Sequence, residues 1–386
     1  MTSININQQM SQKIKKIART VFISLNLITI ILCLLACLVP FLSAGRFPYV
    51  ALAGLVFPLV FFAMLGFLIY WIIRRSKWAF VCAVVLLLSW RQATVAFSFR
   101  TSSNFTTQKT PQQLRVLTWN LSSWGETSKT NSGNKMDTMI ALIKSTNADV
   151  LCLQEYLYCK NKTFRDTVVP ALKESGYQYA YFGKTNFTGR LYTTTILTAV
   201  VLLSKYPIVD TAKFIYNSDN FTDPLVCADI KINDKTVRFF TTHLQSVKFG
   251  ENDYEALHNL KEPSTASLHE TRSLAWKLKQ GYKKRALQAE MLHDKITASP
   301  YPVIVCGDFN DVPNSYTYFT AKGNLQDAFL QKGSGFGRTF RFISPTLRID
   351  YILADKQFDV LQYHTFHVPF SDHYPVVVDL DMEGKK

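Results

Sequence analysis

Val303-Ile304-Val305-Cys306-Gly307-Asp308-Phe309-Asn310 is the stretch that decides the fold of this 386-residue chain. Its four apolar residues predict a short strand that is buried on both faces, because a continuous apolar run bounded by Gly is typical of such strands. The strand ends on a carboxylate and, two residues later, an amide. A rigid strand that ends on polar side chains is a common way to hold ligands for one site.

The same arrangement, a short apolar strand beside a polar cluster, recurs along the chain. Further strands are predicted at 115–119, 150–153, 198–203, 225–232, 237–242, 351–354 and 376–380. Helices are predicted at 137–145, 168–175 and 273–296. Strands outnumber helices, and several follow one another directly. This pattern predicts an α/β domain with mixed or antiparallel sheets and not a doubly wound parallel sheet.

The polar clusters share a chemistry of oxygen donors and imidazoles. They are Trp119-Asn120, Gln154-Glu155, Thr242-His243-Leu244, Gly307–Asn310, Ile349-Asp350-Tyr351 and Ser371-Asp372-His373. Carboxylate and amide oxygens suit Mg²⁺ or Mn²⁺ better than zinc. The histidines add donors for negative charge on a phosphoryl group. The sequence has no Gly-x-Ser-x-Gly elbow, Walker A loop, GxGxxG or CxxC, which disfavours the sites that those motifs build.

In this order the clusters resemble those of the endonuclease/exonuclease/phosphatase superfamily. Seven motifs carry the resemblance between residues 114 and 380: Val-Leu-Thr-Trp-Asn (116–120), Leu-Gln-Glu (153–155), Leu-Ser-Lys-Tyr-Pro-Ile (203–208), Thr-His-Leu (242–244), Gly-Asp-Phe-Asn (307–310), Arg-Ile-Asp-Tyr-Ile (348–352) and Ser-Asp-His (371–373). The resemblance implies a four-layer sandwich of two mixed β-sheets flanked by helices, as in deoxyribonucleases. One departure, Thr193-Thr194-Thr195-Ile196-Leu197-Thr198 in place of small residues, indicates an unusual substrate-facing wall.

The resemblance also implies a role for each site residue. Glu155 is the expected principal Mg²⁺ ligand (Mn²⁺ would serve), with Asn120 and Asp372 as further metal ligands. Asp308 is expected to orient or deprotonate the attacking water with the help of Asn310. His373, held by Asp350, would contact the scissile phosphate, and His243 would bind a phosphate oxygen. The implied reaction is in-line attack of water on phosphorus.

The N-terminal part of the chain is predicted to be a membrane anchor. Residues 1–105 carry ten Lys and Arg and no Asp or Glu, which leaves only +5 of the net +15 charge for the remainder. Transmembrane helices are predicted at 21–42, 50–73 and 78–99, because about 20 apolar residues cross a bilayer. The third is the weakest, since Arg91 interrupts it and would have to snorkel. A polar linker is predicted at 100–112, and the catalytic domain at 113–386.

The position of the basic residues predicts the orientation in the inner or plasma membrane. Lys and Arg precede the first span and fill the turn 74–77, whereas the loop between the first two spans has only Arg46. The positive-inside rule then places the N-terminus and the turn 74–77 in the cytoplasm. Three spans would put the catalytic domain outside the cytoplasm, and two would keep it inside; three are favoured.

The expected function is hydrolysis of a phosphodiester or phosphomonoester such as a lipid head group, a nucleotide or another small phosphoester. A nuclease with the same site is the alternative, which the modest domain charge disfavours. A membrane receptor or scaffold with an inactive site is a further alternative. It is disfavoured because such a protein is expected to have lost site residues, and every motif residue is present here. Residues 251–271 are predicted to form a loop. The basic stretch 277–285 is predicted to be a solvated helix face, or else a contact with an anionic substrate or lipid surface. We expect a monomer.

Overall fold

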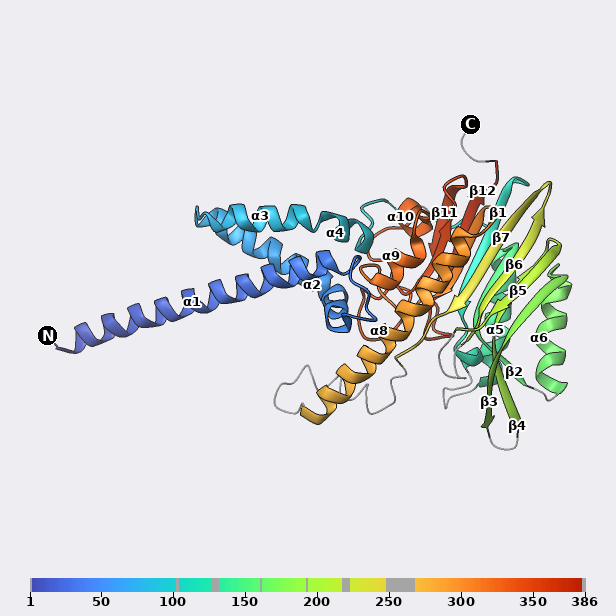
Figure 1. Ribbon diagram of the computed structural model, residues 1–386, viewed down its shortest axis with the longest axis horizontal. Helices are drawn as coiled ribbons and strands as arrows, with labels where there is room; N and C mark the ends of the chain where they lie inside the picture. Colours follow the sequence, from blue (N-terminus) through green and yellow to red (C-terminus); the bar gives the residue numbers. More distant parts are fainter. Residues whose placement is uncertain are drawn as a thin grey trace.

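In the computed structural model, two six-stranded β-sheets lie face to face at the end of the molecule opposite the N-terminus (Figure 1). The structure describes residues 2–101, 104–125, 132–159, 162–191, 194–216, 223–247 and 268–383. The predicted loop 251–271 therefore lies outside the described residues up to position 267.

The first sheet has the strand order β11-β12-β1-β2-β4-β3. Its strands are β1 (Gln113–Asn120), β2 (Val150–Cys159), β3 (Tyr179–Leu191), β4 (Thr194–Ser204), β11 (Asp359–Thr365) and β12 (Val376–Asp381). The second sheet has the order β5-β6-β7-β8-β10-β9. Its strands are β5 (Ile208–Phe214), β6 (Leu225–Ile232), β7 (Lys235–His243), β8 (Val303–Asp308), β9 (Gln326–Asp327) and β10 (Asp350–Ala354). Each sheet has one parallel pair, β1 with β2 and β7 with β8, among antiparallel ones.

Helices cover the outer faces of both sheets. Helices α5 (Ser132–Thr146) and α6 (Lys162–Glu174) cover the first sheet, and α8 (Leu268–Thr297), α9 (Tyr316–Lys322) and α10 (Ala328–Lys332) lie on the side of the second (Figure 1). Three apolar clusters fill the spaces between these layers: one between the sheets, and one under each helical layer. The predicted four-layer sandwich of two mixed sheets is confirmed.

All eight predicted strands lie within observed strands, and the three predicted helices lie largely within α5, α6 and α8. The prediction missed β3, β5, β9 and β11. Strand β5 shows why, because it is an edge strand whose side chains are mostly exposed, so its sequence lacks the apolar signal of a core strand. The short 3₁₀ turn η1 (Ser122–Gly125) follows β1 directly.

Strand register brings the polar clusters to one edge of the sandwich. Asp308 at the end of β8 lies opposite His243 in β7 and Asp350 in β10. Asn120 at the end of β1 lies opposite Gln154 in β2. The two strands of each parallel pair run in the same direction, so their carboxyl ends lie at the same edge of the sheet. These ends bring the polar side chains together where the two sheets meet.

Four helices precede the sandwich: α1 (Thr2–Leu38), α2 (Pro48–Ile73), α3 (Trp78–Leu88) and α4 (Trp90–Ala96), and they extend away from it (Figure 1). The structure has two helices, α1 from Met10 and α2, that are long and apolar enough to cross a membrane. The predicted third span is a pair of helices bent by 54° at Ser89, which would be a third crossing if the pair acts as one span. Arg91 lies just after the bend, with its guanidinium over the rings of Phe41 and Phe319.

The described part of the predicted linker is irregular but bound to the sandwich. The buried guanidinium of Arg115 donates hydrogen bonds to the carbonyls of Thr106 and Thr107, and it pairs with Asp379 at 2.6 Å. The backbone N–H of Thr106 donates to Gln362 at 2.8 Å. These contacts hold residues 106–107 against the first sheet.

Gly307 is the fold position where a side chain would be most damaging to the site. Its φ is +142°, and a Cβ would lie 2.0 Å from the carbonyl oxygen of Thr242 on β7. We expect Gly307→Ala to destabilise the protein by about 2 kcal/mol or more, lowering Tm by roughly 5 °C. Thermal unfolding in detergent measures the change. Gly66→Ala is the control, since nothing lies within 4 Å of a Cβ there; equal Tm values for the two variants would contradict this account.

Candidate active site

Asp308 stands at the centre of the site and is fully buried. A buried carboxylate needs hydrogen-bond donors or positive charge to offset its loss of hydration. Its Oδ2 accepts a hydrogen bond from Nδ2 of Asn120 at 3.0 Å, and its Oδ1 accepts one from the backbone N–H of Asn310 at 2.7 Å. The side chain of Asn310 adds a longer contact at 3.3 Å. The first and second sheets therefore both contribute donors to one carboxylate.

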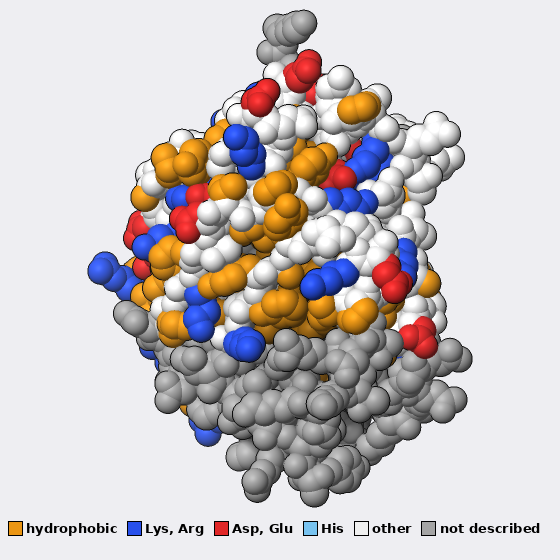
Figure 2. All heavy atoms as spheres, turned by 90° about the vertical axis from the view of Figure 1, so that its right-hand side faces the viewer, with side chains coloured by type: hydrophobic (Ala, Val, Ile, Leu, Met, Phe, Trp, Pro, Cys, Tyr) orange, Lys and Arg blue, Asp and Glu red, His pale blue; other side chains and the backbone are white. Residues whose placement is uncertain are grey.

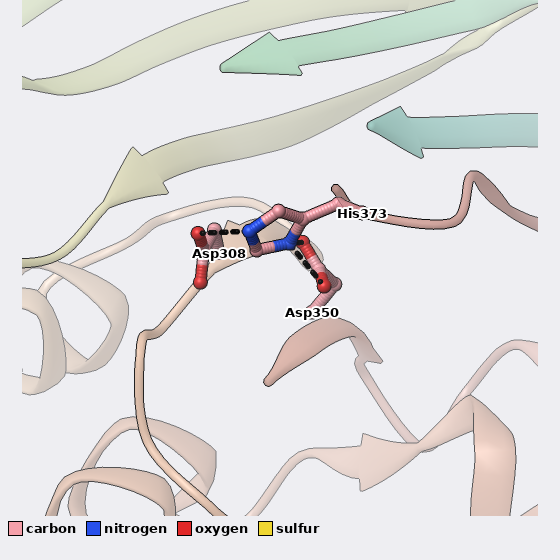
Figure 3. Close-up of side chains that lie close together, drawn as sticks. All are labelled: Asp308, Asp350 and His373. Carbon is pink, nitrogen blue, oxygen red and sulfur yellow. Dashed lines mark hydrogen bonds and ion pairs between the residues drawn. The ribbon is translucent and has the colours of Figure 1, made fainter. Parts of the chain in front are cut away.

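His373 forms the first of two acid–imidazole pairs around Asp308 (Figure 3). Its Nδ1 lies 2.9 Å from Oδ2 of the buried Asp350, and its Nε2 lies 3.6 Å from Oδ2 of Asp308. Burial lowers the pKa of His373, but the charges of Asp350 and Asp308 outweigh it and raise the pKa well above the usual value. The two carboxylates therefore stabilise a positive charge on the His373 ring. Phe340 covers the ring, with centroids 5.1 Å apart.

His243 forms the second pair, with Asp223. Its Nδ1 lies 2.6 Å from Oδ2 of Asp223, and its Nε2 lies 3.6 Å from Glu155 and 3.7 Å from Asp308. Burial lowers the pKa of His243, but the hydrogen bond to Asp223 and the three surrounding carboxylates raise it to about 10. The buried Nε2 has no hydrogen-bond partner among the described residues. It is therefore a donor aimed between Glu155 and Asp308, ready for an anionic oxygen.

Glu155 projects into the site from an irregularity in β2. Its φ is +47°, and the register of β2 with β4 shifts between Leu153 and Tyr156. Such bulges redirect a side chain. The carboxylate accepts a hydrogen bond from Nδ2 of Asn120 at 3.2 Å and remains 34 % exposed. Partial burial raises the pKa of Glu155, and the carboxylate of Asp372 raises it further, against the lowering effect of His243.

The pKa of Asp308 is also raised above its ordinary value. Burial is the main cause and Asp350 adds to it, while His373, His243 and Asn120 act in the opposite direction. A carboxylate with a raised pKa is a stronger base than a solvated one, so it is better suited to accept a proton from water near neutral pH.

The residues present fit a divalent cation beside Glu155. Burial and, to a lesser degree, the neighbouring carboxylate of Asp372 raise the pKa of Glu155, and a cation would relieve the repulsion between the two carboxylates. The side-chain amide of Asn120 lies between Glu155 and Asp308, but its Oδ1 accepts a hydrogen bond from the N–H of Ser122 at 2.9 Å. Its role as an oxygen ligand stays a prediction.

A second group that could hold a cation consists of Asp308, Asp350 and His373, whose ligand atoms lie within 4.8 Å of one another. Both oxygens of Asp350 already face Nδ1 of His373, at 3.1 and 2.9 Å. A cation there would have to displace this pair, so the arrangement favours proton and phosphate chemistry for the group.

The structure brings all eight predicted site residues together. Seven are linked by the contacts above: Asn120, Glu155, His243, Asp308, Asn310, Asp350 and His373. The eighth, Asp372, is joined through Ser371, whose hydroxyl contacts Oδ1 of Asp372 at 3.1 Å and the carbonyl of Asn120 at 2.8 Å. Their roles stay predictions, whereas their position is now defined.

Sequence analysis missed Asp223. It lies 20 residues before His243, ahead of β6, in an Asp-Pro pair with no strand before it that would mark it as a site residue. One feature of the sequence pointed to a missing residue: His373 had a predicted carboxylate partner, Asp350, whereas His243 had none.

This fold and site define a class of protein. Two acid–imidazole pairs surround a buried aspartate at the edge where the two sheets of the sandwich meet, which is the arrangement that a phosphoester hydrolase requires. The chain belongs to the endonuclease/exonuclease/phosphatase family, because the model of the Endonuclease/Exonuclease/phosphatase family matches residues 117–373. It is therefore a hydrolase acting on phosphoesters. A second family model, described as a domain of unknown function, matches residues 19–96. A search among curated proteins finds no match.

Solved structures resemble this chain at low sequence identity. An endonuclease/exonuclease/phosphatase from Beutenbergia cavernae is 22% identical, with a TM-score of 0.52 over 70% of this chain and 72% of that one. The human Nocturnin catalytic domain with bound sulfate is 18% identical, with a TM-score of 0.49 over 70% and 94%. Truncated Caenorhabditis elegans TDP2 is 15% identical, with a TM-score of 0.45 over 70% and 98%.

Removing the charge of Asp223 tests the second pair. We expect Asp223→Asn to lower kcat by roughly 10- to 100-fold, because the ring of His243 loses its orientation and its positive charge. Steady-state kinetics on the best substrate, with circular dichroism to verify folding, measure the effect. Asp210→Asn, which changes an exposed aspartate on β5, is the matched control. Wild-type kcat in Asp223→Asn would show that the pair has no catalytic role.

Proposed function

We propose that this protein is a membrane-anchored, divalent-metal-dependent phosphoester hydrolase that uses an activated water. The observation that carries the proposal is a buried aspartate, Asp308, between two histidines that each have their own carboxylate. This arrangement offers one base and two cationic donors around one small space. A phosphoryl group undergoing attack by water requires these three groups.

Asp308 would take the proton of the attacking water. Its carboxylate is fixed from both sheets by Asn120 and Asn310, so the water that it binds would have one preferred orientation. Asn310 is itself fixed, since its Nδ2 donates to the carbonyl of Leu244 at 3.0 Å. The proton then resides on Asp308, whose raised pKa favours it.

The two histidines are placed to neutralise the phosphoryl oxygens. Both are cationic near neutral pH because their carboxylate partners raise their pKa values. Nε2 of each ring lies 3.6 to 3.7 Å from Oδ2 of Asp308, too far for a good hydrogen bond. Each Nε2–H is therefore available to a substrate oxygen. Mg²⁺ or Mn²⁺ held by Glu155 and Asp372 would polarise the phosphoryl group and stabilise the leaving oxygen.

Three membrane crossings are the topology that the contacts favour. The end of α1 and the turn that follows it contact the catalytic domain. Asn314 donates to the carbonyl of Ala36 in α1 at 3.3 Å, and Ser43 in the turn lies 3.5 Å from Glu290. The end of α4 contacts it as well, since Arg348 donates to the carbonyl of Val95 at 2.8 Å. Helix α2 leaves the domain and the bent pair α3–α4 returns to it (Figure 1). Both contacts lie on one side of a bilayer only if α3–α4 crosses it.

The basic turn at the far end of α2 gives this topology its direction. Arg74, Arg75 and Lys77 lie in the turn that leads to α3, remote from the catalytic domain. With this turn and the N-terminus in the cytoplasm, the catalytic domain lies outside it. Its substrate would then be an extracytoplasmic phosphoester.

A lipid head group, nucleotide or other small phosphoester fits better than a nucleic acid. On the face opposite the N-terminal helices, basic and acidic side chains are interspersed over the described surface, without an extended basic patch (Figure 2). Nucleic-acid binding depends on such a patch. A nuclease remains the alternative that the family allows. Nothing in the proposed chemistry requires a second copy of the chain, and we propose a monomer.

The full-length protein in detergent tests the chemistry. With Mg²⁺ or Mn²⁺ we expect turnover of at least one of bis(p-nitrophenyl) phosphate, choline phospholipids, inositol phosphates and plasmid DNA. Asp308→Asn should lower kcat by about 100-fold or more, since the base is lost, and a chelator should abolish turnover. Asp355→Asn, which changes an aspartate after β10, is the control. If Asp308→Asn and wild type behave alike on every substrate, the proposal is wrong.

Reporter fusions to the full chain test the topology. Alkaline phosphatase fused after Lys386 should be active, because the reporter folds only outside the cytoplasm. The same reporter inserted after Ser76 should be inactive, and a green fluorescent protein there should fluoresce. An inactive phosphatase after Lys386 with normal expression would rule out three crossings.

A further inference from the structure

Four side chains form a stripe along the first half of α8 that the proposed chemistry does not use. Arg272, Trp276, Lys279 and Lys283 follow one another at spacings of four, three and four residues, which places them on one side of a helix. Arg272 and Trp276 are exposed, the latter by 61 %. Three cations and an exposed tryptophan on one helix face are the combination that binds the headgroup region of a membrane.

The stripe lies directly beside the turn that joins α1 and α2. Tyr282 and Ala286 of α8 pack against Ala44 and Ala51 in a shared apolar cluster. On the same side, the ammonium of Lys279 lies 5.3 Å from the ring centroid of Tyr49. The stripe is therefore continuous with the surface around the ends of α1 and α2.

The C-terminal end of α1 and the N-terminal end of α2 indicate how deep the stripe lies relative to a bilayer. Helix α1 ends at Leu38 and α2 begins at Pro48, so the turn between them lies at the level of the lipid headgroups if both helices cross the membrane. From its contact with this turn, α8 continues toward its N-terminus on the side of the membrane helices (Figure 1). The N-terminal end of α8 then reaches the same level.

We propose that this stripe is a binding surface for anionic phospholipid headgroups. The inference rests on the proposed membrane insertion of α1 and α2, and it is independent of the catalytic chemistry. Arg272, Lys279 and Lys283 pair with lipid phosphates, and Trp276 lies at the boundary between headgroups and acyl chains. Tryptophan prefers this boundary, because its ring is amphipathic. The contact fixes the catalytic domain in one orientation on the membrane.

A fluorescent label at position 276 of the full-length protein in lipid nanodiscs tests the contact. Trp276→Cys carries the label, and the quencher is phosphatidylcholine with a nitroxide on its headgroup. We expect at least about threefold more quenching than for the same label in Val209→Cys, an exposed position on β5. Wild-type protein treated in the same way corrects for labelling of the native cysteines. Equal quenching at the two positions overturns the proposal.

The role of charge is tested by adding phosphatidylglycerol to the nanodiscs. We expect the anionic lipid to increase quenching at position 276, and Arg272→Gln/Lys279→Gln/Lys283→Gln to remove this increase. The control variant Lys144→Gln/Lys213→Gln/Lys231→Gln, which changes exposed lysines of the sandwich, should retain it. If quenching at position 276 is the same with and without phosphatidylglycerol, the assignment to anionic headgroups is wrong. Asp308→Asn should leave all quenching unchanged, so that failure here and failure of the catalytic proposal are distinguishable.

Discussion

The burial of one carboxylate, that of Asp308, is the constraint on which the rest of the structure depends. A buried carboxylate is tolerated only when donors and cations compensate for lost hydration. Here the donors come from the ends of β1 and β8, and the cations come from His243 on β7 and His373 after β11. No single sheet could supply all of them. The site therefore exists only where the two sheets are stacked with their strand ends aligned.

Compensation continues outward from Asp308, because each imidazolium needs a carboxylate of its own. Asp223 and Asp350 serve this purpose, and Asp350 is fixed by a hydrogen bond from its N–H to the hydroxyl of Thr339 at 3.1 Å. Gln154 donates to Thr118 in the first sheet and Thr241 in the second, and so ties the sheets together beneath the site. The result is a preorganised polar network in which the charge of each group is set by its neighbours.

The N-terminal helices support the same network. Arg348, two residues before Asp350, is buried between Asp327, at 2.7 Å, and the carbonyl of Val95 in α4. Asn314, four residues after Asn310, contacts the carbonyl of Ala36 in α1, and the backbone at Gly54 in α2 approaches Asn314 so closely that a Cβ would lie 2.0 Å from its carbonyl oxygen. The loops that carry Asn314 and Arg348 therefore pack against the N-terminal helices. The catalytic domain would lose these contacts if it were separated from residues 1–99.

The sequence by itself determined the core strands, the order of the site motifs and the two long apolar helices, because apolar runs and strand-end side chains are local properties of a chain. It predicted that Asp308, Asp350 and His373 belong to one site, and the structure brings these three side chains together. Only the tertiary structure decided that Asp223 faces His243, since the pair joins a loop to a strand end and leaves no local pattern. The tertiary structure also decided that the ends of α1 and α4 pack against the sandwich. Hydropathy cannot show such contacts. Contacts between distant segments depend on how the sheets and helices pack, and that is a property of the whole fold.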